Sequence, residues 1–503
     1  MKWIRPLSAQ VEETAEMVGS KAHGLVVLHR LGLPVPAGFV VTTEACRAFL
    51  SDGRLPHGLD DELATAITGL EAATGRNFGG TQMPLAVSVR SGASVSMPGM
   101  MNTILNLGLT TGATAGLAAE TGDQRFALDS RQRLLSSFAS AITSDRPIPD
   151  EATRQLELAV ETVFSSWDTP RARTYRELHD VPHHLGTAAI VQTMVFGNRD
   201  DHSGTGVAFS RDPNTGENVP FGEVLFGHQG EDVVSGRSLT RPLHELADRA
   251  PAVWTGLLDA LRRVEGHYRD ACYIEFTFQA GELWILQVRP DRFVGGAAVR
   301  VATDLADEHV IGRHEALLRV SPQHLRHVRT PRIAPTEKTD ILARGLGACP
   351  GVAVGRLATT ADGAVRMAAD GPVILVRPET SPHDMRGLAA ATGIVTARGG
   401  PASHAAVVAR AMGKPAVVGI TDLAVDVDAA SVSAGGRTIS EGALVTIDGT
   451  SGEVALNSPR IVTTAANAHL HRLLEWADDV SGDHTERDEA QRLTAAHAAL
   501  RHE

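Results

Sequence analysis

The sequence predicts an α/β protein with more than one domain. Its 503 residues are enough for about three domains of ordinary size. Apolar residues make up 43% of the chain and charged residues 21%, which is typical of a globular protein with a substantial core. Short apolar runs bounded by Gly and Pro alternate with segments in which apolar residues recur every three or four positions, so both strands and helices are expected.

The charge balance and the lack of long apolar runs argue against several classes of function. A formal net charge of -12 argues against a general nucleic-acid binder and against tight adhesion to an anionic membrane. No stretch approaches the roughly 20 apolar residues that span a bilayer, and residues 1–10 are not followed by the apolar run of a signal peptide. Cys46, Cys272 and Cys349 have no CxxC spacing, which indicates buried, reduced thiols. We therefore expect a cytoplasmic protein.

Periodicity and punctuation predict the organisation of the chain. We expect a first domain over 1–330, a linker over 331–341, a second domain over 342–460 and a charged helical tail over 461–503. Helices are expected over 125–143, 151–167 and 304–319, and strands over 85–89, 188–196, 204–210, 274–278 and 283–288, the last two joined by a hairpin at 279–282. Strands of the second domain are expected over 373–376, 393–396, 416–419 and 444–447, with helices between them.

His404 is the candidate nucleophile. A predicted strand runs into residues 398–404, Arg-Gly-Gly-Pro-Ala-Ser-His, and then into a helix of small residues, for which Ser403 is the expected N-cap. The free N–H groups and the dipole at a helix start favour an anion and disfavour an imidazolium, so His404 should be neutral and able to accept a phosphoryl group. A structural histidine is the alternative, and the local spacing alone favours it.

A nucleotide site of the common glycine-loop types is not expected. Residues 19–21, Gly-Ser-Lys, lack the earlier glycine of a GxxxxGK[ST] loop, and residues 204–206 lack the third glycine of a dinucleotide fingerprint. An ATP site in this chain would need cations for the triphosphate and carboxylate or amide oxygens for Mg²⁺.

Residues 399–415, Gly-Gly-Pro-Ala-Ser-His-Ala-Ala-Val-Val-Ala-Arg-Ala-Met-Gly-Lys-Pro, resemble the phosphohistidine signature of the pyruvate phosphate dikinase family. The family's relatives include phosphoenolpyruvate synthase, enzyme I of the sugar phosphotransferase system and rifampicin phosphotransferase. Residues 373–384 are similar to the dikinase as well. The resemblance implies that His404 carries phosphate on a swivelling β/β/α domain.

The first half of the chain resembles the family's nucleotide-binding domain in several motifs in the family's order. They lie at 18–24 with 31–39, at 87–101, at 204–212, at 229–232, at 274–277 and at 286–289. The resemblance implies an ATP-grasp fold with ATP and Mg²⁺ as cofactors. It implies that Lys21 and Arg90 hold phosphate, that Glu275 and Gln287 bind Mg²⁺, and that Arg289 neutralises the transferring group. Taken singly, each of these charges has a plainer interpretation as a solvated surface residue.

Two residues depart from the family's pattern. Tyr273 stands where the family has an aspartate thought to help the metal-bound phosphates react, and tyrosine cannot bind Mg²⁺ as a carboxylate does. Ala402 stands where the plant enzymes have a regulatory threonine, so that control is not expected here.

The resemblance covers about residues 10–480, and the family's (α/β)₈ barrel, which binds pyruvate or phosphoenolpyruvate, is not among them. The expected function is a phosphotransferase that uses ATP and inorganic phosphate and passes phosphate to pyruvate on a separate barrel protein, or to another small acceptor. A rifampicin-type enzyme is a rival, although only about 50 residues separate Arg289 from Leu342. A non-catalytic regulatory homologue is the other rival, favoured by Tyr273.

Overall fold

The computed structural model describes residues 2–95, 97, 100–142, 147–234, 240–290, 293, 295–326, 328, 331–334, 339–401, 403–463 and 468–501. They form two compact units. The first comprises Met1–Gly204, Phe226–His228 and Glu275–Arg289, and the second comprises Thr205–Leu225, Gln229–Ile274 and Pro290–Glu503. Each unit is described by itself.

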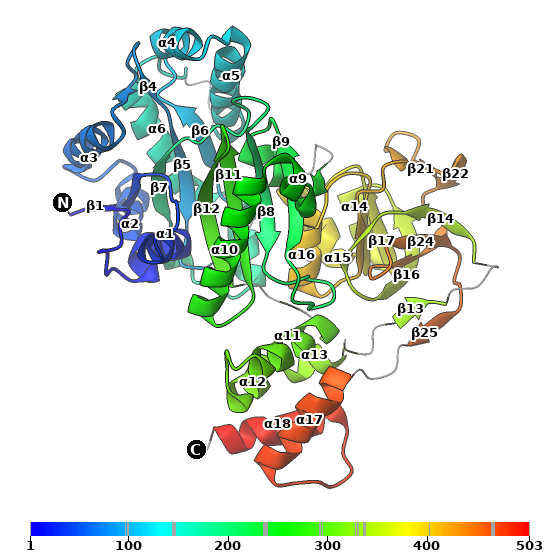
Figure 1. Cartoon of the computed structure of the whole chain (residues 1–503). Coiled ribbons are helices and arrows are strands. Elements are labelled where there is room, and N and C mark those ends of the chain that lie inside the picture. Colours follow the sequence, from blue (N-terminus) through cyan, green and yellow to red (C-terminus); the bar gives the residue numbers. More distant parts are fainter. Residues whose placement is uncertain are drawn as a thin grey trace. The chain divides into compact units, whose positions relative to one another are not determined.

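The first unit contains a five-stranded sheet with the order β1-β2-β7-β5-β6. Its strands are β1 (Ile4–Pro6), β2 (Gly38–Val41), β5 (Val87–Gly92), β6 (Thr103–Leu107) and β7 (Ala188–Thr193). The helices of this unit are α1 (Ala15–Arg30), α2 (Thr43–Asp52), α3 (Leu59–Thr74), α4 (Thr111–Thr121), α5 (Gln124–Ala141), α6 (Ala152–Ser165) and α7 (Pro170–Leu178) (Figure 1). The expected helices over 125–143 and 151–167 correspond to α5 and α6, whereas the strand expected over 188–196 ends earlier, at Thr193.

A second five-stranded sheet has the order β10-β9-β8-β11-β12. Its strands are β8 (Gly204–Phe209), β9 (Phe221–Phe226), β10 (Arg241–Pro242), β11 (Cys272–Gln279) and β12 (Glu282–Pro290), with α10 (Pro251–Tyr268) between β10 and β11. Ala280 and Gly281 join β11 to β12 and have φ of 50° and 82°. Two successive residues with positive φ are typical of the tight turn that joins antiparallel strands, so the expected hairpin is confirmed.

An eight-stranded sheet carries the candidate nucleophile in the second unit. Its order is β14-β24-β23-β16-β17-β18-β19-β15, and β16 to β19 run parallel. The strands are β14 (Ile341–Arg344), β15 (Leu346–Cys349), β16 (Val352–Ala358), β17 (Val373–Arg377), β18 (Gly393–Thr396), β19 (Ala416–Val418), β23 (Leu444–Asp448) and β24 (Glu453–Leu456). Helices α14 (Ala361–Ala368), α15 (Met385–Ala390) and α16 (His404–Met412) connect the parallel strands. All four strands that the sequence predicts for the second domain are present.

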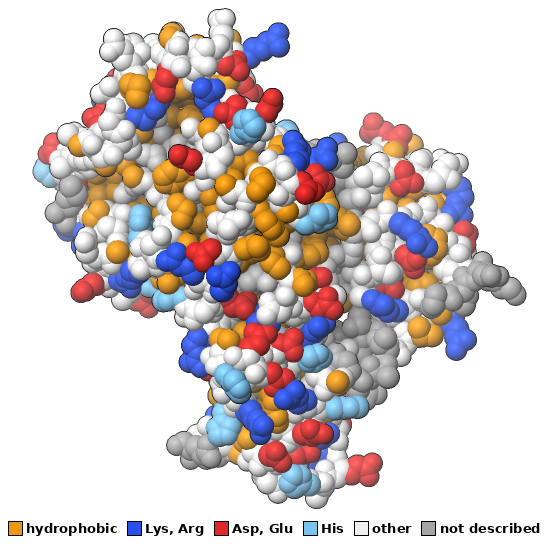
Figure 2. Space-filling model, in the orientation of Figure 1, with side chains coloured by type: hydrophobic (Ala, Val, Ile, Leu, Met, Phe, Trp, Pro, Cys, Tyr) orange, Lys and Arg blue, Asp and Glu red, His pale blue; other side chains and the backbone are white. Residues whose placement is uncertain are grey.

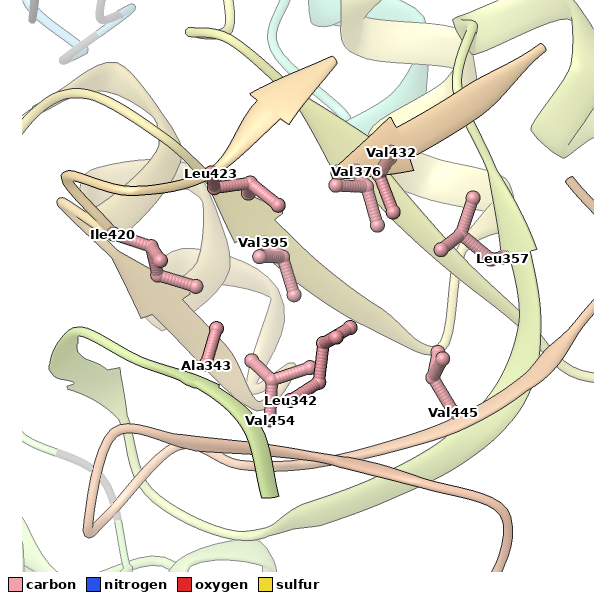
Figure 3. A pocket seen from close by; sticks show the side chains of 10 residues that line it. All are labelled: Leu342, Ala343, Leu357, Val376, Val395, Ile420, Leu423, Val432, Val445 and Val454. Carbon is pink, nitrogen blue, oxygen red and sulfur yellow. The ribbon is translucent and has the colours of Figure 1, made fainter. Parts of the chain in front are cut away.

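The interior of this part of the chain is an aliphatic core. Figure 3 shows ten side chains that converge on one small space, all of them from Leu, Ala, Val or Ile residues between Leu342 and Val454. The space measures about 10 Å³, which is at the lower limit for a single water molecule. It is therefore a packing defect of the core and not a ligand site. A three-stranded sheet of β20 (Ala424–Asp426), β21 (Ser431–Ala434) and β22 (Arg437–Ser440) completes the region.

Five helices from two distant segments share one hydrophobic core. They are α11 (Gly295–Asp307), α12 (Arg313–Arg319), α13 (Pro322–Arg326), α17 (Ala468–Ser481) and α18 (Glu489–Leu500). The single helix expected over 304–319 is therefore wrong, because α11 ends at Asp307 and α12 begins only at Arg313. The tail expected over 461–503 begins with a strand, Ile461–Thr463, and is helical from Ala468 to Leu500 apart from one connection. Figure 2 shows Lys, Arg, Asp, Glu and His side chains over the visible face of this cluster.

A two-stranded ribbon forms in the segment predicted as a linker. β13 (Pro331–Ile333) pairs antiparallel with β25 (Ile461–Thr463), so the chain enters and leaves the region 341–456 through adjacent strands. The N–H of Ile333 donates to Oδ2 of Asp448 at 2.9 Å. Residues 335–338 of the expected linker lie outside the described part of the chain.

All three cysteines are buried and form no disulfide. In the described part of the chain, no helix has both the length and the apolar character that crossing a bilayer requires.

Candidate active site

A kink near the start of α1 positions Lys21. Gly19 has φ of 82° and ψ of 153°, which interrupts the helical path, and the N–H of Ser20 donates to the carbonyl oxygen of Ala93 at 3.0 Å. An ideal Cβ on Gly19 would lie 1.7 Å from the carbonyl oxygen of Gly92. Only glycine fits this conformation and this close approach, so Lys21 begins a helical stretch tied to the end of β5.

Arg90, on β5, is held from two sides. Its Nη2 donates to the carbonyl oxygen of Leu286 on β12 at 2.6 Å and to Oε1 of Gln192 on β7 at 3.1 Å. Its Nη1 lies 3.7 Å from Oε2 of Glu275. The Nε atom is buried and has no hydrogen-bond partner within the described residues. The guanidinium is thus fixed in place by β7 and β12, and its Nε–H has no partner among the described residues.

Glu275 and Gln287 lie on the two strands of the hairpin, and each has side-chain oxygen. The side chain of Glu275, on β11, is 27% exposed, whereas Gln287, on β12, is only 8% exposed. Arg289 follows on β12 and is partly exposed. Between Gln287 and Arg289, the carbonyl oxygen of Val288 lies 2.9 Å from an ideal Cβ on Gly24, so α1 packs closely on this strand.

Burial and neighbouring charges change the pKa of Lys21 in the first unit. The pKa of Lys21 falls to about 8, first because the ammonium is buried and then because Arg90 is near, while Glu275 acts in the opposite direction. The ammonium is still mainly protonated at pH 7. The structure therefore brings Lys21, Arg90 and Glu275 together, with Gln287 and Arg289 on the adjoining strand. Such a cluster of cations can bind a polyphosphate.

Tyr273 is buried in an aromatic cluster. It is 4% exposed, and its ring meets the ring of Phe209 edge-on, with the centroids 5.1 Å apart. Val207, Leu225 and Val233 pack in the same cluster. The residue in the place of the family aspartate thus contributes to apolar packing.

His404 begins α16, and residues 397–403, which include the glycine pair, join it to β18. Ser403 is the N-cap residue, as expected, but its hydroxyl does not cap the helix: Oγ is buried and has no partner within the described residues. The N–H of Ser403 instead donates to the carbonyl oxygen of Gly400 at 3.0 Å, which closes a turn. Ala402 and three residues of the motif at 87–101, Ser96, Pro98 and Gly99, lie outside the described residues.

The two nitrogens of the His404 ring have different surroundings. Nδ1 lies 2.9 Å from Oγ1 of Thr380, whereas Nε2 is buried without a hydrogen-bond partner in the described part of the chain. Burial lowers the pKa of His404 to about 4, and the nearby carboxylate of Asp384 acts against this. The ring is therefore neutral at pH 7, as expected, although burial has the largest effect and not the helix field on which the sequence argument relied.

Sequence reasoning did not single out Thr380, Asp384 or Gln192. Thr380 binds the ring of His404, and Asp384 is fixed by the N–H of Ser381 at 2.8 Å. A signal for the first two was present, because parallel neighbouring strands end at the same edge of a sheet. That rule places the residues that follow β17 beside those that follow β18, and the sequence analysis did not use it.

Comparison with known proteins identifies both parts of the chain. The model of the pyruvate phosphate dikinase AMP/ATP-binding domain matches residues 15–65 and 52–241. The model of the mobile domain of PEP-utilising enzymes matches residues 369–452. The first match contains Lys21 and Arg90, and the second contains Thr380 and His404.

Three curated relatives show the same similarity over almost the whole chain. Pyruvate, phosphate dikinase of Clostridium symbiosum is 38% identical over 527 residues, and that of Rhizobium meliloti (strain 1021) is 39% identical over 543 residues; each alignment covers 95% of this chain and 60% of the relative. Pyruvate, phosphate dikinase 2 of Zea mays is 40% identical over 92% of this chain and 58% of its own length. The chain thus spans about 60% of the length of these relatives. With both domain models in the relatives' order, the chain belongs to the pyruvate phosphate dikinase family of PEP-utilising enzymes.

Proposed function

We propose that the protein is an ATP-dependent phosphotransferase of the dikinase type in which His404 is phosphorylated. The observation that carries the proposal is the difference between the two nitrogens of the His404 ring. Nδ1 of His404 is engaged by Thr380, while Nε2 is neutral and unpartnered within the described residues, at the start of a helix. A buried polar atom without a partner is costly, and a phosphoryl group on Nε2 would meet the free N–H groups of the helix start.

The proposed reaction begins with the lone pair of Nε2. In this tautomer Nδ1 carries the ring proton and donates a hydrogen bond to Oγ1 of Thr380. A bond forms between Nε2 and the β-phosphorus, the bond from that phosphorus to the α,β-bridging oxygen breaks, and AMP leaves with the electron pair. The positive charge gained by the ring is offset by the phosphoryl oxygens. The γ-phosphoryl group passes to inorganic phosphate, giving pyrophosphate, and His404 keeps one phosphoryl group.

The cluster of the first unit is the proposed ATP site. Lys21 and Arg90 would hold phosphate oxygens, and Arg289 would neutralise charge on the transferring group. The buried Nε of Arg90, which has no partner among the described residues, supports this role.

The same cluster fits a magnesium ion. Within the described residues, no three His, Cys, Asp or Glu side chains gather closely enough to hold a metal alone. Mg²⁺ is usually bound by one or two protein oxygens together with substrate phosphates. Glu275 and Gln287 would supply those oxygens, one from the carboxylate of a partly exposed side chain and one from a nearly buried amide. The ion would neutralise the phosphates.

The final acceptor follows from the resemblance to the relatives. We propose that phosphohistidine passes its group to pyruvate on a separate barrel protein, or to another small acceptor. A carrier that serves two sites has to move, and the ribbon of β13 and β25 supplies adjacent entry and exit strands for such a movement. Tyr273 supports the other candidate, a non-catalytic regulatory homologue, because its ring is packed in an apolar cluster.

A labelling experiment tests the proposed function. The protein is incubated with β-³²P-ATP or γ-³²P-ATP, Mg²⁺ and inorganic phosphate, and protein-bound label is measured before and after mild acid. We expect acid-labile label from β-³²P-ATP in the wild type and none in His404→Gln. His383→Gln is the matched control, because His383 is exposed in the same region, and it should label like the wild type. An unlabelled wild type would support the regulatory homologue.

A further inference from the structure

A buried carboxylate lies next to the segment that holds the ring of His404. Asp384 is only 7% exposed and ends the short helical turn Pro382–Asp384, which comes after β17. Its Oδ2 accepts hydrogen bonds from the N–H of Ser381 at 2.8 Å and from Oγ of Ser381 at 3.0 Å. Ser381 directly follows Thr380, whose Oγ1 lies 2.9 Å from Nδ1 of His404. Asp384 therefore anchors the backbone beside the residue that contacts the ring.

The second oxygen of Asp384 faces a cation. Nε of Arg377, at the end of β17, lies 3.3 Å from Oδ1 of Asp384, and Nη1 of Arg377 donates to the carbonyl oxygen of Thr359 at 2.9 Å. A buried charge is tolerated where it is paired and hydrogen-bonded, and Asp384 meets both conditions. The carboxylate is thus held in one position by Ser381 and Arg377.

The charge of Asp384 reaches the ring of His404. Burial lowers the pKa of His404, and Asp384 is the charged group among the described residues that acts in the opposite direction. Glu379 and Arg398, which lie on the two loops at this edge of the sheet, form an ion pair with each other. The remaining charged or titratable side chains on the segments around the ring are Glu223 on β9, Cys349, His383, Arg386, Arg410 and Lys414.

The charge of the His404 ring changes during the proposed reaction. The free ring is neutral, with its proton on Nδ1, and it keeps that proton when Nε2 bonds to phosphorus, so the phosphorylated ring is positively charged. In a later transfer the bond between phosphorus and Nε2 breaks, the electron pair returns to Nε2, and neutral imidazole is the leaving group. If Nδ1 lost its proton first, the leaving group would be an imidazolate anion, which leaves far less readily. The proton on Nδ1 therefore keeps the phosphoryl group transferable.

We propose that Asp384 stabilises the protonated, positively charged ring of phosphorylated His404 and thereby keeps its phosphoryl group transferable. A charge that is fixed before the reaction, in a site with little water, stabilises a developing opposite charge without reorganisation. Asp384 is a positioning residue as well, because it holds Ser381 beside Thr380. The proposal rests on the proposed function, since it concerns the state that follows phosphorylation of His404 by ATP.

Asp384→Asn tests the charge apart from the hydrogen bonds. The Asn side chain has the same shape, and its oxygen can still accept hydrogen bonds from Ser381, so the turn is kept while the charge is lost. We expect the initial rate of His404 labelling by ATP to fall by about tenfold, the effect of a shift of one pKa unit, with the Kd for ATP unchanged. Asp362→Asn is the matched control, because Asp362 is exposed in the first turn of α14. It should label at the wild-type rate.

The pH dependence of phosphohistidine hydrolysis distinguishes the charge from the structure. The labelled protein is freed of nucleotide by gel filtration, and the transfer of label to water is followed over a range of pH. Label is lost quickly where the ring is protonated and slowly where it is not. Without the carboxylate the protonated ring is less stable, so in Asp384→Asn the midpoint of the profile should move to lower pH by about 1 unit. Above the midpoint, label in this variant should last about tenfold longer. An unchanged midpoint would overturn the proposal.

Two further variants separate an electrostatic effect from damage to the fold. Ser381→Ala removes one hydrogen bond to Asp384 and keeps the charge, so the midpoint should stay at the wild-type value. Arg377→Gln removes the cation that opposes Asp384, so the midpoint should move to higher pH. A shift to lower pH in either variant would show that the midpoint follows the loss of structure and not the charge, and would overturn the proposal.

Titration of the free ring tests the effect of Asp384 without any phosphorylation. The ring nitrogens of His404 are followed by NMR in the absence of ATP as the pH is lowered. With a pKa of about 4 in the wild type, protonation should first be detected near pH 5, and in Asp384→Asn it should begin at a lower pH. Identical titration in the two proteins would overturn the proposal. If the wild type is not labelled by ATP, the proposed function fails, and this titration still decides whether Asp384 acts on the ring.

Discussion

Oγ1 of Thr380 lies 2.9 Å from Nδ1 of His404, and under the proposed function this contact leaves Nε2 as the nitrogen that reacts. Thr380→Val keeps the shape of the side chain and removes the hydroxyl. Because one hydrogen bond that orients the ring is lost, we expect His404 labelling by ATP to slow by about three- to tenfold. The initial rate of labelling measures the effect.

The conservative variant Thr380→Ser separates orientation from packing. It keeps the hydroxyl and removes one methyl group, so it should restore most of the rate lost in Thr380→Val. Equal rates in the wild type and Thr380→Val would mean that this hydroxyl does not set the tautomer.

The two shifted pKa values predict the pH dependence of labelling. His404 has a pKa of about 4, so its nucleophilic neutral form persists at any pH above that value. Lys21 has a pKa of about 8, so its charged form is lost above that pH. We expect kcat/KM for ATP to be level between about pH 5 and pH 7.5 and to fall above about pH 8, because kcat/KM reports groups of the free enzyme.

Two results would contradict this profile. A decline that begins near pH 6.5 would indicate a histidine with an ordinary pKa. An alkaline decline that persists in Lys21→Met would show that Lys21 is not the group that titrates. The acid side needs a control for protein stability, because the neutral, buried His404 resists protonation in the folded state. The free energy of unfolding therefore decreases as the pH falls from about 6.5 towards 4.

Prediction from the sequence succeeded where a pattern is local. The strands around His404 are almost entirely apolar and are bounded by Gly or Pro, and β17, β18, β19 and β23 lie where expected. The histidine begins a helix at the expected position, with Ser403 as the N-cap residue, although the Ser403 hydroxyl makes no capping hydrogen bond. The hairpin of β11 and β12 could be predicted for the same reason, since its turn is formed by adjacent residues.

Features that depend on distant segments could not be predicted. Nothing around Gly400 indicates that Glu223, 177 positions earlier, occupies the space of its side chain. The break between α11 and α12 was missed because both helices are packed by α17 and α18, which come more than 140 residues later. The low pKa of His404 was expected from its helix, but burial by tertiary packing is the larger cause.

Removal of the Lys21 ammonium should weaken ATP binding more than it slows chemistry. In Lys21→Met the stem is kept and the charge is lost, so we expect the Kd for ATP to rise by about 10- to 100-fold, which corresponds to one charge-assisted contact. Calorimetric titration with ATP and Mg²⁺ measures the effect. Lys2→Met removes an exposed lysine and is the matched control. An unchanged Kd in Lys21→Met would exclude Lys21 from the nucleotide site.

Restoring the family carboxylate at position 273 should destabilise the protein. Tyr273→Asp removes a ring that packs edge-on against Phe209 and places a carboxyl group in an apolar cluster. Loss of the aromatic packing and burial of a charge should together lower the free energy of unfolding by about 3–5 kcal/mol. Chemical denaturation measures the change, with Tyr273→Phe as the control that keeps the ring. If Tyr273→Asp is as stable as the wild type and is labelled by ATP faster than the wild type, then this position is open to the bound phosphates, and the aromatic cluster does not exclude a metal ligand there.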